Sequence, residues 1–144
     1  MEWQTNLHHF FREKIKSLLH EARSLGLDVD VFQGYRSIEE QDRLFAKGRT
    51  SPGVKVTNAR GGYSWHNFGI AADIVFKKGG GWSWEENHNW SLLGDLGTEQ
   101  GLDWGGNWPK FRDRPHFQWN TDLTLNKARK LLKEGGLDKV WENL

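Results

Sequence analysis

Apolar positions near the start of the chain recur every three or four residues, which is the spacing of one helical face. The stretch NLHHFFREKIKSLLHEARSLG carries eight such positions, namely Leu7, Phe10, Phe11, Ile15, Leu18, Leu19, Ala22 and Leu25. Gly26 follows and is typical of a helix end. The pattern therefore predicts an amphipathic helix over residues 7–25.

Two further helices are indicated by their first residues. Residues 37–48 open with Ser37 and Glu40, which have the spacing of a capping box, and a glycine ends the segment. Residues 124–135 begin at Thr124, a favourable N-cap, and also end in glycine. Each segment is long enough for two to three helical turns.

The remaining pattern predicts three strands and a fourth helix. VDVFQ (29–33) alternates apolar and polar residues. IAADIVF (70–76) is an apolar run typical of a strand buried on both faces. HFQW (116–119) is a short strand whose entry is fixed by Pro115. The stretch 86–101 is expected to be helical in spite of its two internal glycines.

Composition narrows the class of protein. The 144 residues fit one domain, 1–144, and the irregular order of strands and helices predicts an α+β fold with a small sheet. There is no cysteine, so any metal must be held by His, Asp or Glu. The net charge is +1 without a long block of one sign, which argues against a nucleic-acid partner. No apolar stretch approaches the length of a membrane span, so no membrane insertion is expected.

Aromatic residues and glycines are unusually frequent. The chain has 9 Trp and 17 Gly, and many of the tryptophans lie beside glycines between Trp82 and Trp119. They can form an aromatic core with glycine-rich loops, or a groove whose aromatic walls hold a sugar or a peptide. The two interpretations are compatible.

The first candidate for chemistry is a carboxylate in an apolar strand. Asp73 lies inside IAADIVF, and a buried carboxylate is costly unless it is paired or binds a metal. His66 lies seven residues earlier, and Gly69 between them permits the bend that would turn both side chains to one side. His116 lies on the predicted strand 116–119 and can join them if the two strands are neighbours. Two histidines and one aspartate form a ligand set typical of catalytic zinc.

Asp113 is a candidate for proton transfer. It lies three residues before His116, too far along the chain to reach the same metal easily, but it can lie beside the attacking water. Alternatively, it is a loop residue that pairs with Arg112 or Arg114.

Arg36 and Ser64 have similarly open roles. Arg36, just before the predicted helix at 37–48, is a fixed cation for a substrate carboxylate or oxyanion, or a partner in a surface salt bridge. Ser64 is a donor to substrate or a plain loop serine. The other histidines fit a metal site less well and are expected to be surface or structural residues: His8, His9, His20 and His88.

The motifs resemble those of the D-Ala-D-Ala carboxypeptidase-like zinc peptidases. SWHNFGIAADI resembles their Ser-x-His-x-x-Gly-x-Ala-x-Asp motif, and DRPHF resembles the second motif, with an acidic residue three positions before the third ligand. GYRSIEEQDRLFAKGRT, VTNARGGYSWHNFG and GLDWGGNWPKFRDRPHF resemble the branch of L-alanyl-D-glutamate endopeptidases found in phage endolysins and bacterial cell-wall hydrolases. The resemblance covers about residues 29–119.

The resemblance implies a role for each matched residue. It implies one Zn²⁺ per chain, held by His66, Asp73 and His116. It implies Asp113 as the acid-base residue, Arg36 as the cation that binds the oxyanion, and Ser64 as a contact to the substrate. The implied fold is a small antiparallel sheet flanked by helices, as in the hedgehog and DD-peptidase domains. The implied partner is the peptide stem of peptidoglycan.

The resemblance leaves several alternatives. A D-alanyl-D-alanine carboxypeptidase or dipeptidase is the alternative enzyme, and a non-catalytic zinc-containing wall-binding domain is the alternative of another class. The start of the chain lacks a basic segment followed by an apolar one, so we expect no signal peptide, synthesis in the cytoplasm and action on the wall, after holin-type release if a phage encodes the protein. We expect a monomer. Either its own groove binds the wall, or the sequence is the catalytic part of a larger protein.

Overall fold

The centre of the molecule is an antiparallel sheet of five short strands. The computed structural model describes residues 2–144. The strands run in the order β1-β2-β5-β4, and β3 pairs with the far end of β2. Their bounds are β1 Val29–Gln33, β2 Ala71–Lys78, β3 Gly81–Ser83, β4 Leu102–Trp104 and β5 His116–Trp119.

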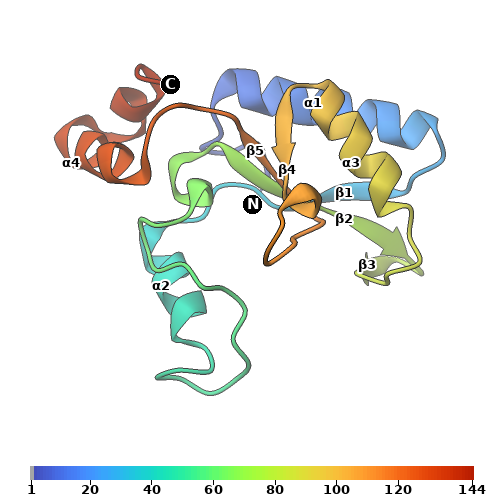
Figure 1. Ribbon diagram of the computed structural model, residues 1–144, viewed down its shortest axis with the longest axis horizontal. Coiled ribbons are helices and arrows are strands. Elements are labelled where there is room, and N and C mark those ends of the chain that lie inside the picture. Colours follow the sequence, from blue (N-terminus) through green and yellow to red (C-terminus); the bar gives the residue numbers. More distant parts are fainter. Residues whose placement is uncertain (1) are drawn as a thin grey trace.

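Four α-helices surround this sheet. They are α1 His9–Ser24, α2 Ile38–Ala46, α3 Trp90–Glu99 and α4 Leu125–Trp141, with short 3-10 helices η1 Trp65–Phe68 and η2 Gly105–Asn107. In Figure 1, α1 and α3 lie together over one face of the sheet, α2 projects on the other side, and α4 lies at one end. The α+β class and the small antiparallel sheet flanked by helices are therefore confirmed. No helix in residues 2–144 is long and apolar enough to cross a membrane.

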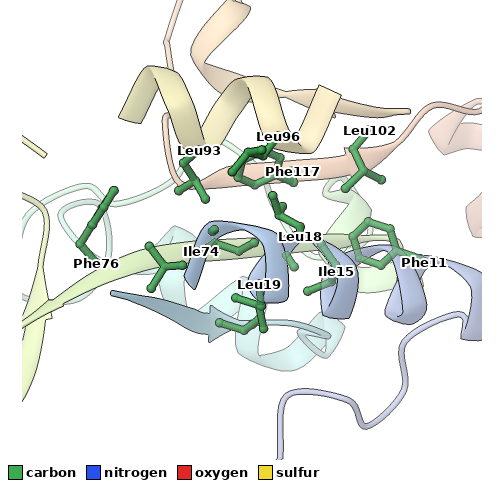
Figure 2. Close-up of a cluster of buried hydrophobic side chains, with 14 of the residues drawn as sticks. Phe11, Ile15, Leu18, Leu19, Ile74, Phe76, Leu93, Leu96, Leu102 and Phe117 are labelled. Atoms are coloured by element: carbon green, nitrogen blue, oxygen red, sulfur yellow. The ribbon is translucent and has the colours of Figure 1, made fainter. Parts of the chain in front are cut away.

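The main core lies between the sheet and the pair α1 and α3. Figure 2 shows side chains of α1, β2, α3, β4 and β5 meeting there. Phe11, Ile15 and Leu18 of α1 are fully buried, as are Ile74 of β2 and Phe117 of β5. Each such side chain stabilises the fold by about 1.5–3 kcal/mol. The helical period of the first segment is thus confirmed for the positions that face the sheet, whereas Phe10 and Leu25, which the same pattern included, are exposed at 60% and 58%.

A second, smaller core fixes α4 against η1. Phe68 and Ile70 pack there against α4 residues such as Leu131 and Val140. The indole N–H of Trp141 donates to the Phe68 carbonyl at 2.7 Å. Because η1 leads directly into β2, this packing also fixes where β2 begins.

Most predicted elements are present, with differences at the ends. The strand at 29–33 has the predicted bounds. Ser37 caps α2 by accepting from the Glu40 N–H at 3.0 Å, while the Glu40 carboxylate pairs with Arg43 at the surface. The regular helix that begins at Leu125 ends at Gly135 as predicted, because Gly135 and Gly136 have non-helical φ and ψ, and a second short helical segment follows this kink to Trp141.

Two strands and both 3-10 helices were not predicted. β3 and β4 have three residues each, too few for an alternating pattern to be recognised. Each is formed because a neighbouring strand supplies the pairing: β3 pairs with β2, and β4 pairs with β5.

Candidate active site

The three predicted metal ligands meet at the middle of the sheet. Asp73 of β2 and His116 of β5 are direct cross-strand partners. His66 lies in η1, and Gly69 ends that helix in the left-handed conformation at φ 72°, which turns the chain into β2. One ligand atom from each of the three side chains lies within 4.8 Å of the others. In residues 2–144 no other group of His, Cys, Asp or Glu has this geometry.

Each histidine forms a hydrogen bond through the ring nitrogen that faces away from Asp73. His66 Nδ1 lies 2.8 Å from the Gly34 carbonyl oxygen, so it carries the proton and donates to that oxygen. His116 Nε2 lies 2.8 Å from Gln118 Oε1 and donates in the same way. The free nitrogens, His66 Nε2 and His116 Nδ1, then face Asp73. Metal-binding histidines characteristically have such a partner on the other nitrogen.

Asp73 carries an oxygen that the protein itself leaves unpaired. Its Oδ1 is buried and has no hydrogen-bond partner among the described residues, although His116 Nδ1 lies at 3.3 Å and His66 Nε2 at 3.4 Å. Burial acts to raise the pKa of Asp73, whereas protonation of His66 and His116 beside it would lower that pKa below its usual range. The carboxylate is thus ionised and aimed at the space between two imidazole nitrogens, an environment that fits a zinc ion.

Arg36 lies beside Asp73 Oδ2, the carboxylate oxygen that does not face the two histidines. Its Nη2 is 3.8 Å from Asp73 Oδ2, and its side chain is only 12% exposed. Burial lowers the pKa of the guanidinium, an effect that the negative charge of Asp73 opposes. A guanidinium remains charged under these conditions. The surface salt bridge considered from the sequence is therefore replaced by a largely buried ion pair.

Two buried amides hold Arg36 in place, and sequence reasoning missed both. Gln41 of α2 is fully buried and accepts from Arg36 Nη1 at 2.9 Å, while its own amide donates to the Ala59 carbonyl at 2.8 Å. Asn67 of η1 is also buried and donates to the Arg36 carbonyl at 2.8 Å. A polar residue on an amphipathic helix gives no sign in the sequence that it faces inward.

Asp113 stands at the rim of the cluster, in the loop before β5. Its side chain is exposed, and among residues 2–144 it forms no ion pair with Arg112 or Arg114. The walls of the cleft still limit its contact with solvent, and this partial burial together with the charge of Asp73 raises the pKa of Asp113. A carboxylate with a raised pKa is a better proton acceptor.

The loop that carries Asp113 packs directly against Gly105. The Asp113 N–H donates to the Gly105 carbonyl at 3.0 Å, and a Cβ at Gly105 would lie 2.3 Å from the Asp113 carbonyl oxygen. A Cβ at Gly106 would lie 2.2 Å from the Trp104 ring. A side chain at either position would therefore collide with the Asp113 backbone or with the Trp104 ring.

A cleft of about 1010 Å³ joins all six predicted site residues. Ser64 lines it and also caps η1, because its Oγ accepts from the His66 N–H at 3.3 Å. Of the tryptophans, Trp90 is buried in the core and also borders the cleft, which Trp84 and Trp108 line as well.

The other histidines lie outside this cluster. His8 is the N-cap of α1 and accepts from the Phe10 N–H through Nδ1. His88 stacks on Phe76, with the ring centroids 4.4 Å apart.

Comparison with known proteins gives a consistent result. A family model described as D-alanyl-D-alanine carboxypeptidase matches residues 57–119. The peptidoglycan L-alanyl-D-glutamate endopeptidase CwlK of Bacillus subtilis (strain 168) is 37% identical over 123 residues, 79% of this chain and 74% of that protein. The L-alanyl-D-glutamate peptidase of Listeria phage A118 is 28% identical over 107 residues, 73% of this chain and 35% of that protein.

Solved structures share the fold. The L-Ala D-Glu endopeptidase ChiX of Serratia marcescens matches with a TM-score of 0.60 and 25% identity over 82% of this chain and 84% of that one. The LD-carboxypeptidase LdcB matches with a TM-score of 0.64 over 100% of this chain and 72% of that one, at 19% identity. With the ligand geometry described above, these likenesses mean that the chain belongs to the D-Ala-D-Ala carboxypeptidase-like zinc peptidases, in the branch of the L-alanyl-D-glutamate endopeptidases.

Proposed function

We propose that this protein is a zinc-dependent endopeptidase that hydrolyses the L-alanyl-D-glutamate bond in the peptide stems of peptidoglycan. The observation that carries the proposal is the composition of the cleft. One cavity contains a metal-binding set with an unpaired buried carboxylate oxygen, a buried cation and a carboxylate with a raised pKa. A purely structural zinc site would need neither Arg36 nor Asp113, which argues against a non-catalytic wall-binding domain.

His66, Asp73 and His116 would hold one zinc ion per chain, and a zinc ion held there acidifies the attacking water and polarises the scissile carbonyl. Asp113 accepts a proton from the attacking water as the C–O bond forms at the carbonyl carbon. Arg36, fixed by Gln41, stabilises the negative charge that develops on the carbonyl oxygen. Asp113 then gives its proton to the leaving amine as the C–N bond breaks. The products are an alanine carboxylate and a new D-glutamyl amino terminus.

The remaining role belongs to Ser64. It lines the cleft two residues before His66, as the N-cap residue of η1. We assign it to contact with the substrate backbone. The enzyme acts as a monomer on the cell wall in this proposal.

A carboxypeptidase acting on terminal D-alanine is the second candidate, because Arg36 is a buried cation that would suit a terminal carboxylate. Digestion of purified peptidoglycan distinguishes the two. We expect labelling of new amino termini to give D-glutamate. Release of free D-alanine or its dimer without new D-glutamyl termini would contradict the proposal, and absence of any cleavage by the zinc-loaded protein would favour the non-catalytic alternative.

A further inference from the structure

Three exposed aromatic rings lie together near the proposed metal site of His66, Asp73 and His116. Phe32 is 47% exposed, Trp82 37% and Trp84 51%. The Phe32 ring lies edge-on to both indoles, with centroids 5.3 Å from Trp82 and 5.1 Å from Trp84. Lys77 Nζ lies 4.2 Å from the centroid of the Trp82 ring. We call these three residues the aromatic platform.

Strand register places the platform on the same face of the sheet as Asp73. Trp82 pairs with Lys77, which is four residues beyond Asp73 on β2 and therefore on the same side. Phe32 lies at an irregularity in β1, next to Gln33, the partner of Asp73. Phe32 and Trp84 line the cleft that contains the metal ligands. Four residues along a strand span about 13 Å, so Trp82 lies roughly two sugar or amino-acid units from Asp73, whereas Phe32, next to the strand partner of Asp73, lies within about one unit.

The substrate has a sugar at about that distance. In a peptidoglycan stem, L-alanine is joined through a lactyl group to the muramic acid of the glycan strand. An enzyme that cuts on the carboxyl side of this alanine must accommodate the glycan one residue away from the scissile bond. Exposed aromatic groups that continue a cleft mark a ligand-binding surface.

We propose that the aromatic platform binds the amino sugars of the glycan strand and holds them beside the stem peptide being cut, an inference that rests on the proposed function. The apolar C–H face of a pyranose ring can stack on an indole, while its hydroxyl and acetamido groups meet polar neighbours. Glu86 and Gln33 line the same cleft and supply such groups. Lys77 Nζ lies over one face of the Trp82 ring, so a ring-shaped ligand would stack on the opposite face of that indole or on Trp84, which is 51% exposed.

An amino sugar fits the platform better than the far end of the stem. The stem beyond D-glutamate carries a diamino acid and small alanines; its cationic amine would be repelled by Lys77, whose Nζ already lies 4.2 Å from the centroid of the Trp82 ring, and alanines gain little from indole faces. The three rings are also separate and edge-on, so they do not form the flat, continuous patch that a second protein chain would need.

The activity test uses two soluble substrates with the same stem peptide. One carries the GlcNAc-MurNAc disaccharide on L-alanine, and the other carries an acetyl group there, so neither has a free amine. We expect the wild type to prefer the disaccharide substrate in kcat/KM, and Trp84→Ala and Phe32→Ala to reduce this preference roughly tenfold. Phe10→Ala, which removes a 60% exposed ring on α1 outside the cleft, should keep it.

A binding test separates this inference from the proposed function. Chitotetraose is titrated into the zinc-loaded protein while the indole N–H signals are followed by NMR. We expect Trp82 and Trp84 to shift and Trp141, which lies in the second core, to stay in place. Equal losses on both substrates in the variants, or no indole shift at millimolar sugar, would overturn the platform. Sugar binding without any peptide cleavage would instead keep the platform and overturn the proposed function.

Discussion

Asp113 is the residue whose predicted role depends most directly on its charge. Asp113→Asn keeps the size of the side chain but cannot accept a proton from water, so we expect activity to fall roughly 100- to 10,000-fold. Zinc content and thermal stability should stay at the wild-type values, because the side chain is exposed and holds no part of the core. Asp122→Asn, at an exposed position after β5, is the matched control. Wall lysis by Asp113→Asn at the wild-type rate would mean that another residue is the base.

The raised pKa of Asp113 also predicts how activity depends on pH. Its carboxylate must be ionised to accept the proton, so kcat/KM should fall as the pH drops through the raised pKa. Restricted contact with solvent acts on Asp113 in the zinc-loaded enzyme as well, whereas a zinc ion would offset the charge of Asp73, so the restricted solvent contact alone places this acidic limb above the ordinary value of an aspartate, about 3.9. The profile is measured on the acetylated stem peptide. The residual activity of Asp113→Asn should lack this limb, and a limb that persists there would assign it to another group.

At the scale of elements, the position of Asp113 depends on η2. Gly105→Ala would place a Cβ against the Asp113 carbonyl oxygen, so the loop before β5 must move. A displacement of about 1 Å in a catalytic group can cost on the order of 100-fold in rate, and we expect a loss of that size. Zinc content should fall less than activity, because of the three proposed ligands only His116 is tied to the displaced segment, through its N–H to the Asp113 carbonyl at 3.1 Å.

Gly81→Ala is the control for this prediction. Gly81 lies in β3, and a Cβ there would meet its nearest neighbour at 3.9 Å, so the substitution is accommodated. Activity close to the wild type for Gly81→Ala and a strong loss for Gly105→Ala would support the steric explanation. Full activity of Gly105→Ala would show that the Asp113 loop is not fixed by this contact.

Elements with a clear local pattern could be predicted from the sequence. The apolar stripe of α1 and the run of β2 specify both type and position, and Asp73 was notable because it interrupts an apolar run. Gly69 allowed the turn that brings His66 to the same side. The roles of Gln41 and Asn67 could not be predicted, because the carbonyls to which they donate, Ala59 and Arg36 respectively, are 18 and 31 residues away and are brought near only by tertiary packing.

At the scale of the whole molecule, the proposed metal site and the neighbouring Arg36 link parts of the chain that are far apart in sequence. His66 is held by Gly34, Asp73 pairs with His116, and Arg36 ties α2 to the same point. Without a metal ion, Asp73 Oδ1 is a buried acceptor with no hydrogen bond, which costs stability. Zinc should therefore stabilise the entire fold and not only the cleft.

We expect removal of zinc by a chelator to lower Tm reversibly. Zinc at 100 times its Kd contributes about 2.7 kcal/mol, which for a chain of this length corresponds to roughly 5–10 °C. His116→Ala and Asp73→Ala should lose most bound zinc by metal analysis, and their Tm should no longer respond to it. His20→Ala, an exposed histidine of α1, should respond like the wild type. If both ligand variants retained full zinc and the wild-type response, the ion would have to bind elsewhere, and the buried oxygen of Asp73 would need another partner.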